Sequence, residues 1–296
     1  MKTILYATDC TVNDIASLKY AYRFSTIMNA DLHIIHVYEF PPIANATLHA
    51  PELLKKRMHN DQTKLVENFC KANLKHEFQQ KPVTTHVIEN SSVSESIQRL
   101  SRVLTPDLVL IGMQDHHSTR GYFSGNIANE LLDTIEMPLL IVPNGMVYNT
   151  ISTIVYATDF EEYDILSLQK LAEIARPFSA LIEVIHVYKT DEYPAKILME
   201  GFKKRLLQKT SYPEIAFKTI ASTNIKSGLL SIVNWENANV LAMLERKHNW
   251  NLANLFHKDL VKEMESAISI PLLVFNKRSI ETEESFVPIK GAVMAC

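Results

Sequence analysis

The feature that most constrains this chain of 296 residues is a segment that occurs twice. Residues 3–9 read TILYATD, and residues 153–159 read TIVYATD, a shift of 150 positions. The tetrapeptide IHVY at residues 35–38 recurs at 185–188 with the same shift. Self-similarity at a fixed spacing indicates one folding unit written twice.

A third match fixes the end of this unit. Residues 138–142 (PLLIV) correspond to residues 271–275 (PLLVF) with a shift of 133, so the second copy is 17 residues shorter. A repeat of this size can bury a hydrophobic core of its own and is a whole domain. We therefore expect a first copy over residues 1–147, a second copy over 148–279 and a polar tail over 280–296.

Short apolar runs alternate with segments of helical periodicity in each copy. Residues 4–7 (ILYA) are almost wholly apolar, which is typical of a strand buried on both faces of a parallel sheet. Residues 13–28 follow as one predicted helix, and residues 92–95 (SVSE) resemble a capping box at the start of another. The order β-α-β-α-β-α-β-α-β predicts an α/β fold with helices on both faces of a parallel sheet.

Composition and charge argue against several classes of function. The chain is 47% hydrophobic and 21% charged, as globular proteins are. Its net charge is −3 and no basic block is present, so we expect no nucleic-acid partner. No apolar run approaches the ~20 residues that cross a bilayer, so we expect no membrane partner. Three cysteines without a CxxC pair, and no cleavable leader, favour a cytoplasmic location.

Ligands of open α/β sheets bind at the carboxyl ends of strands, where the strand order reverses. Asp9 follows the first strand, and it either contacts a ribose or adenine or holds its own loop together. Its recurrence as Asp159 does not separate these roles. Gly125 and Asn126 stand where the helix after the fourth strand begins, which suits an anion or, equally, a tight turn with an ordinary N-cap.

Taken together, these segments resemble the universal stress protein (UspA) family over roughly residues 2–144 and 151–277. The resemblance rests on ILYATD with the hydroxyl of Thr11, on HVY at residues 36–38, and on PLLIVP at 138–143. It implies two tandem Rossmann-like (adenine nucleotide alpha hydrolase-like) domains. Each is expected to be a five-stranded parallel sheet of order 3-2-1-4-5.

The ATP-binding branch of this family carries a loop that reads G-x₂-G-x₉-G-[S/T]. Gly112, Asp115, Gly125 and Asn126 occupy its four places here, with the spacing intact. Asp115 brings a negative charge toward the phosphates, and two like charges at ~4 Å cost about 1 kcal/mol even in water. The resemblance implies that an adenine nucleotide such as ATP is bound in the first copy by Ala7, Thr8, Asp9, Thr11, Val37, Ile111, Gly112, Gln114, Gly125, Asn126 and Ile127.

The second copy has lost the residues that would face a phosphate. Its loop at residues 243–259 contains no glycine, and Glu161 replaces Thr11. We therefore expect nucleotide binding in the first copy only. The basic residues of this loop leave two possibilities open, another anion or a solvated loop that packs its apolar side chains: Arg246, Lys247, His248 and Lys258.

Other chemistry is weakly supported. His116 and His117 have no third ligand fixed by spacing, so we expect no metal. Cys10 adjoins the expected site and could be redox-sensitive, but an unreactive thiol is the simpler interpretation. The chain has no G-x-G-x-x-G after its first strand, no P-loop and no G-x-S-x-G, so we expect no catalytic residues and no enzyme.

We expect a non-enzymatic stress-response module that senses a nucleotide or binds a protein partner of unknown identity. The alternatives are an interaction scaffold with both sites inactive and a nucleotide-hydrolysing enzyme on the same fold. Members of the family commonly dimerise. The resemblance therefore implies an intramolecular pseudo-dimer that pairs residues 138–142 with 271–275, and a further homodimer is left open.

Overall fold

A computed structural model describes residues 1–41, 51–113, 125–245, 257–265 and 267–277. The first copy contains β1 (Thr3–Ala7), η1 (Val12–Asp14), α1 (Ile15–Ile27), β2 (Asp31–Tyr38), α2 (Pro51–Gln80), β3 (Thr84–Glu89), α3 (Val93–Leu104), β4 (Leu108–Gly112), α4 (Gly125–Thr134) and β5 (Leu139–Val142). The second copy contains β6 (Thr153–Ala157), α5 (Glu162–Ala175), η2 (Arg176–Phe178), β7 (Leu181–Tyr188), α6 (Glu192–Lys209), β8 (Ile215–Ala221), α7 (Ile225–Trp235), β9 (Val240–Glu245), α8 (His257–Glu265) and β10 (Leu272–Asn276).

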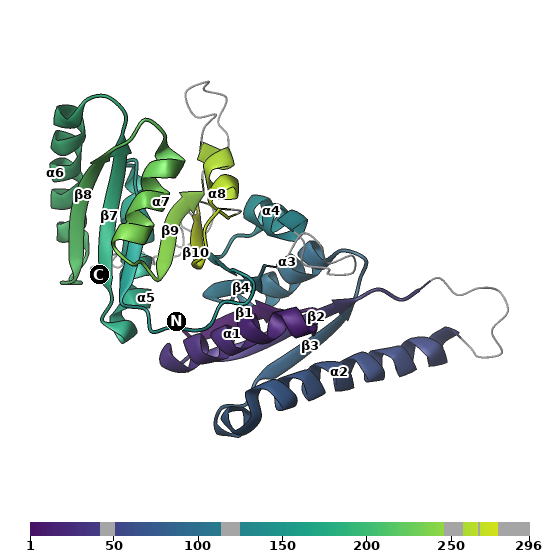
Figure 1. The fold of residues 1–296 in the computed structure, drawn as a ribbon. Helices are drawn as coiled ribbons and strands as arrows, with labels where there is room; N and C mark the ends of the chain where they lie inside the picture. The colour runs from purple at the N-terminus through teal and green to yellow at the C-terminus, as the bar shows by residue number, and fades with distance from the viewer. Residues whose placement is uncertain (42–50, 114–124, 246–256, 266, 278–296) are drawn as a thin grey trace, which may run out of the picture.

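The strands of both copies form one continuous sheet (Figure 1). Across the described residues its order is β3-β2-β1-β4-β5-β10-β9-β6-β7-β8. All pairs within a copy are parallel, so each half has the order 3-2-1-4-5. The predicted fold class is confirmed, as two Rossmann-like halves in tandem.

Alternate residues of each strand belong to hydrophobic cores on opposite faces of the sheet. Ile4 and Tyr6 of β1 pack in the core that contains buried residues of α1, α2, α5 and α6. Leu5 and Ala7 pack in the core that contains buried residues of α3, α4, α7 and α8. Because both faces are covered, β1 has almost no polar positions, which explains the apolar runs of the sequence.

The two half-sheets meet at their fifth strands. β5 pairs with β10 in an antiparallel register, with Leu140 opposite Leu273. The Nδ2 atom of Asn276, which is buried, donates to the carbonyl oxygen of Ile135 at 2.8 Å and adds a polar link between the copies. Since this pair alone is antiparallel, the strands of the two copies run in opposite directions. Their carboxyl ends therefore lie at opposite edges of the sheet.

The helices of the first copy begin close to where the sequence predicted, with differences at α1 and α3. One half of the predicted capping box is present at the start of α3, where the hydroxyl of Ser92 accepts from the backbone N–H of Glu95 at 3.2 Å. The backbone N–H of Ser92 donates to Asn90 Oδ1 at 3.0 Å instead of to the side chain of Glu95. The single helix predicted over residues 13–28 is instead a 3-10 turn, η1, followed by α1. The side chain of Asp14, the last residue of η1, is buried, with an exposed fraction of 1%.

Nothing in the described helices combines the length and the apolar character that crossing a lipid bilayer requires.

The link through Asn276 predicts a measurable loss of stability. Asn276→Ala leaves the buried carbonyl of Ile135 without this donor, and we expect the free energy of unfolding to fall by about 1–3 kcal/mol. Urea denaturation measures this change. Asn60→Ala, at an exposed position of α2, is the control and should change stability by less than about 0.5 kcal/mol. Equal effects of the two substitutions would contradict the role given to Asn276.

Candidate functional site

The turn after β1 is built around the buried carboxylate of Asp14. The hydroxyl of Thr8 donates to Asp14 Oδ2 at 2.7 Å, and the backbone N–H of Asp9 donates to the same oxygen at 2.8 Å. Cys10 has a φ of 61°, in the left-handed region, and its N–H donates to Thr8 Oγ1 at 3.0 Å. The turn is therefore tied to the start of α1 by side chains that are themselves buried.

Asp9 contributes to the same turn. Its Oδ1 accepts from the backbone N–H of Thr11 at 2.9 Å, and its carboxyl group also interacts with that of Asp14. The loop-holding role that the sequence left open for Asp9 is thus present in the structure. Thr8 is fully buried with its hydroxyl engaged, so its side chain is not presented to a ligand.

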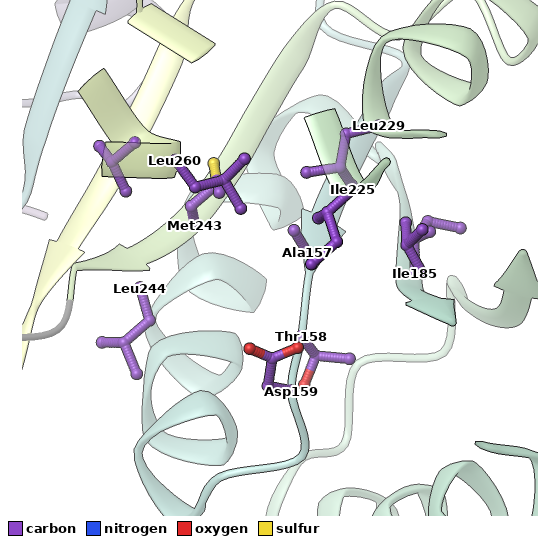
Figure 2. A pocket seen from close by; sticks show the side chains of 11 residues that line it. Ala157, Thr158, Asp159, Ile185, Ile225, Leu229, Met243, Leu244 and Leu260 are labelled. Atoms are coloured by element: carbon purple, nitrogen blue, oxygen red, sulfur yellow. The ribbon is translucent and has the colours of Figure 1, made fainter. Parts of the chain in front are cut away.

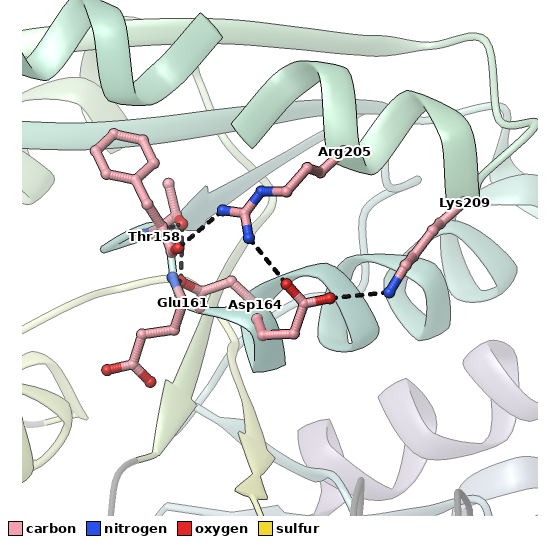
Figure 3. Close-up of polar contacts among 7 residues, drawn as sticks. Thr158, Glu161, Asp164, Arg205 and Lys209 are labelled. Carbon is pink, nitrogen blue, oxygen red and sulfur yellow. Dashed lines mark hydrogen bonds and ion pairs between the residues drawn. The ribbon is translucent and has the colours of Figure 1, made fainter. Parts of the chain in front are cut away.

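The second copy repeats this arrangement around Asp164 (Figure 3). The hydroxyl of Thr158 donates to Asp164 Oδ2 at 2.8 Å, as does the N–H of Glu161 at 3.0 Å. The hydroxyl of Tyr156 donates to Asp164 Oδ1 at 2.8 Å. Asp14 and Asp164 were missed as organising residues by the sequence analysis. Their separation by 150 positions, the shift of the repeat, was the signal that could have revealed them.

The histidine of each IHVY segment holds the same turn from β2 or β7. His36 Nδ1 lies 3.0 Å from the carbonyl oxygen of Thr8, and His186 Nδ1 lies 2.8 Å from that of Thr158. A carbonyl oxygen only accepts, so Nδ1 carries the proton in both rings. The recurring histidines are therefore hydrogen-bonded structural residues at strand ends.

Burial shifts the pKa values of Asp14 and Cys10 in the turn after β1. Burial, followed by the neighbouring Asp9 carboxylate, raises the pKa of Asp14 above its usual range. Burial also raises the pKa of the Cys10 thiol well above its usual range. Because the thiolate is the reactive form, Cys10 is a poor nucleophile at neutral pH.

Gly112 ends β4 where the backbone approaches α1. A Cβ atom at this position would lie 2.4 Å from Ser17 Oγ and 2.8 Å from Ser17 Cβ. It would also lie 3.3 Å from Asp14 Oδ1. Packing alone therefore requires glycine here, whether or not a ligand binds.

Leu244 occupies the equivalent position of the second copy, because Ala7 pairs with Ile111 as Ala157 pairs with Met243. The strand-order reversal of this copy holds a cavity of only about 40 Å³. Figure 2 shows Asp159, two residues after the end of β6, at one end of a cavity that Met243, Leu244 and further apolar side chains line. Sites for small molecules usually measure about 300–1,000 Å³, so this cavity is too small for a nucleotide.

A second difference is that α6 ties down the turn of the second copy (Figure 3). Arg205 donates to Glu162 Oε2 at 2.9 Å and to the carbonyl oxygen of Phe160 at 3.3 Å. Lys209 donates to Glu162 Oε1 at 2.8 Å. The equivalent of Glu162 in the first copy is Val12, whose side chain is 81% exposed and forms no such ion pair.

The remaining predicted residues divide into three groups. Ala7, Val37 and Ile111 are buried at the ends of β1, β2 and β4, and Ile127 is buried in α4. Gly125 and Asn126 begin α4, as the sequence predicted for the helix N-terminus. The positions for which no placement is described are Gln114, Asp115, His116, His117 and Arg120 of the first copy and Arg246, Lys247 and His248 of the second. Among the described side chains, no group of three suited to a metal ion is present.

The universal stress protein family matches residues 1–143. A universal stress protein from Archaeoglobus fulgidus DSM 4304 is similar in structure, with a TM-score of 0.64 and 12% identity over 93% of this chain and 96% of that one. A universal stress protein from Pseudomonas aeruginosa UCBPP-PA14, described as putative, gives 0.60 and 12% over 96% of each chain.

The same architecture occurs in a transport protein. The cytoplasmic domain of a prokaryotic cation chloride cotransporter has a TM-score of 0.52 and 10% identity over 95% of this chain and 99% of that one. No curated protein matches the chain. At these identities the likenesses establish the fold alone.

The raised pKa of Asp14 predicts a pH dependence of stability. The folded protein keeps this proton where the unfolded chain has lost it, so its contribution is complete below about pH 4 and is lost as the pH rises toward about 8. Asp14→Asn mimics the protonated acid, and its stability should depend less on pH over this window. Urea denaturation at several pH values tests this, with Asp61→Asn at an exposed position of α2 as control. Parallel curves for wild type and Asp14→Asn would contradict the assignment.

The close packing of Gly112 predicts that even a methyl group is costly. Gly112→Ala forces Ser17 or the backbone to shift, and we expect a loss of about 1–3 kcal/mol of stability. Gly201→Ala is the matched control, because nothing lies within 4 Å of the added Cβ on α6. That variant should be neutral or more stable. Thermal denaturation of both variants measures the change. If Gly112→Ala were as stable as Gly201→Ala, the close packing assigned to Gly112 would be wrong.

Proposed function

Because the universal stress protein family matches residues 1–143, we propose that the chain is a non-enzymatic stress-response module that binds an adenine nucleotide such as ATP in its first copy only. The observation that supports the asymmetry is the cavity at the strand-order reversal of the second copy. It measures only about 40 Å³ and is lined by Leu244 among other apolar side chains, which leaves too little room for a nucleotide.

The proposed nucleotide lies at the carboxyl end of β1, β2 and β4. There the backbone of Ala7 and Thr8, the carboxylate of Asp9 and the end of β4 would hold the base and ribose. The N-terminus of α4, at Gly125 and Asn126, supplies backbone N–H groups and the positive end of a helix dipole for the phosphates. Asp115 opposes this attraction, so we propose weak binding.

A scaffold with two inactive sites is the second candidate, and one observation favours it. The carboxylate of Asp9 already accepts from Thr11 and interacts with Asp14, so the turn is complete without a ligand. In that case the module works through its surface. No group in the turn is arranged to activate a water molecule or a nucleophile, so hydrolysis is the least supported function.

Calorimetric titration with ATP separates the two candidates. We expect weak binding by the wild type, at least about fivefold tighter binding by Asp115→Gly because a like charge of about 1 kcal/mol is removed, and loss of binding in Asp9→Ala. Asp159→Ala is the matched control at the equivalent position of the second copy and should bind as the wild type does. Absence of binding in both the wild type and Asp115→Gly would reject the nucleotide site and leave the scaffold.

A further inference from the structure

A groove of about 560 Å³ runs between the start of α1 and the chain that follows β5. Its walls come from residues 12–23 and residues 144–148. The volume falls within the usual range of about 300–1,000 Å³ for small-molecule sites. Val12 and Val147 are lining residues with exposed fractions of 81% and 74%, so apolar surface is presented to solvent.

The charged residues of the groove have one sign. Lys19 and Arg23 line it from α1 and are spaced four residues apart, so they lie on one face of the helix. The lining residues that the structure describes include no aspartate or glutamate. Two cations beside apolar surface favour an anion that carries an apolar body.

Two phenol hydroxyls, those of Tyr20 and Tyr148, are shielded from solvent beside the groove. Tyr148 lines the groove, and its ring packs edge to face against that of Tyr20 with centroids 5.1 Å apart. In the described part of the chain neither hydroxyl has a hydrogen-bond partner. Burial raises the pKa of Tyr148 to about 12. The positive charge of Arg23 lowers this pKa, so Arg23 is near enough to the phenol to act on it. Buried hydroxyls without partners are rare, so these two mark an unusual polar feature of the packing beside the groove.

The second copy lacks the positive pair, so the groove's charge is not a general property of the repeated fold. Lys19 and Arg23 correspond to Gln169 and Glu173, so the positive pair is absent there. The equivalent of Asn13 is Tyr163, and the ammonium group of Lys277 lies 4.2 Å from the centroid of its ring. The cationic groove is therefore a feature of the first copy.

We propose that this groove binds one small amphipathic anion from solution, a carboxylate or phosphate attached to an apolar body. Lys19 and Arg23 hold the anionic group, and the valines and Tyr148 cover the apolar part. The site is separate from the proposed nucleotide site, so either can exist without the other.

Octyl phosphate and octanoate are the probes, and octylammonium is the charge control. Isothermal titration of the full chain should show one octyl phosphate or octanoate bound per chain and no binding of octylammonium. The variant Lys19→Gln/Arg23→Gln should bind both anions at least about tenfold more weakly, because charge-assisted hydrogen bonds are among the stronger ones. Lys64→Gln/Lys204→Gln removes the same charge from exposed positions of α2 and α6 and should bind as the wild type does.

Several results would overturn the proposal. These are no binding of either anion, equal weakening by the two double variants, or binding to phosphatidylglycerol vesicles without binding of the soluble anions. Asp9→Ala separates this site from the nucleotide site, because that variant should still bind octyl phosphate. Loss of octyl phosphate binding in Asp9→Ala would show that the anion enters the strand-end site instead.

Discussion

A buried carboxylate at the start of the first helix is the constraint on which each copy depends. Asp14 and Asp164 accept hydrogen bonds from the turn that follows the first strand, and this ties the turn to the start of the helical segment in each copy. In the first copy the same carboxylate lies 3.3 Å from where a Cβ of Gly112 would be. One buried acid therefore ties the turn, the helix and the end of β4 into the floor of the strand-order reversal.

The two copies share this floor and have diverged around it. The turn of the second copy is anchored by Arg205 and Lys209 of α6, and Leu244 narrows its cavity to about 40 Å³. The turn of the first copy has Val12 at its outer side and glycine at the end of β4. The turn is anchored by ion pairs from α6 in the second copy, whereas Val12 of the first copy forms no such ion pair, and this difference is a physical basis for dividing structural and ligand-binding roles between the copies.

The repeat and the apolar runs predicted two α/β units with parallel sheets, because strands buried on both faces have a distinctive local pattern. The strand order within each unit was implied by the family resemblance. The sequence did not show that Asp14 turns inward, since periodicity over residues 13–28 treats it as one polar position of a helix. The packing demand at Gly112 was also hidden, because it depends on how closely β4 approaches Ser17. Of the residues predicted for the site, Ala7, Val37 and Ile111 lie toward the carboxyl ends of the neighbouring strands β1, β2 and β4, and their role in binding stays a prediction.

The central claim is that a nucleotide site persists in the first copy and has been lost from the second. Photolabelling of the full chain with 8-azido-ATP, followed by mapping of the labelled peptides, tests it most directly. The account predicts label within residues 1–147 that unlabelled ATP displaces. Displaceable label within residues 148–279, or none anywhere, would contradict it.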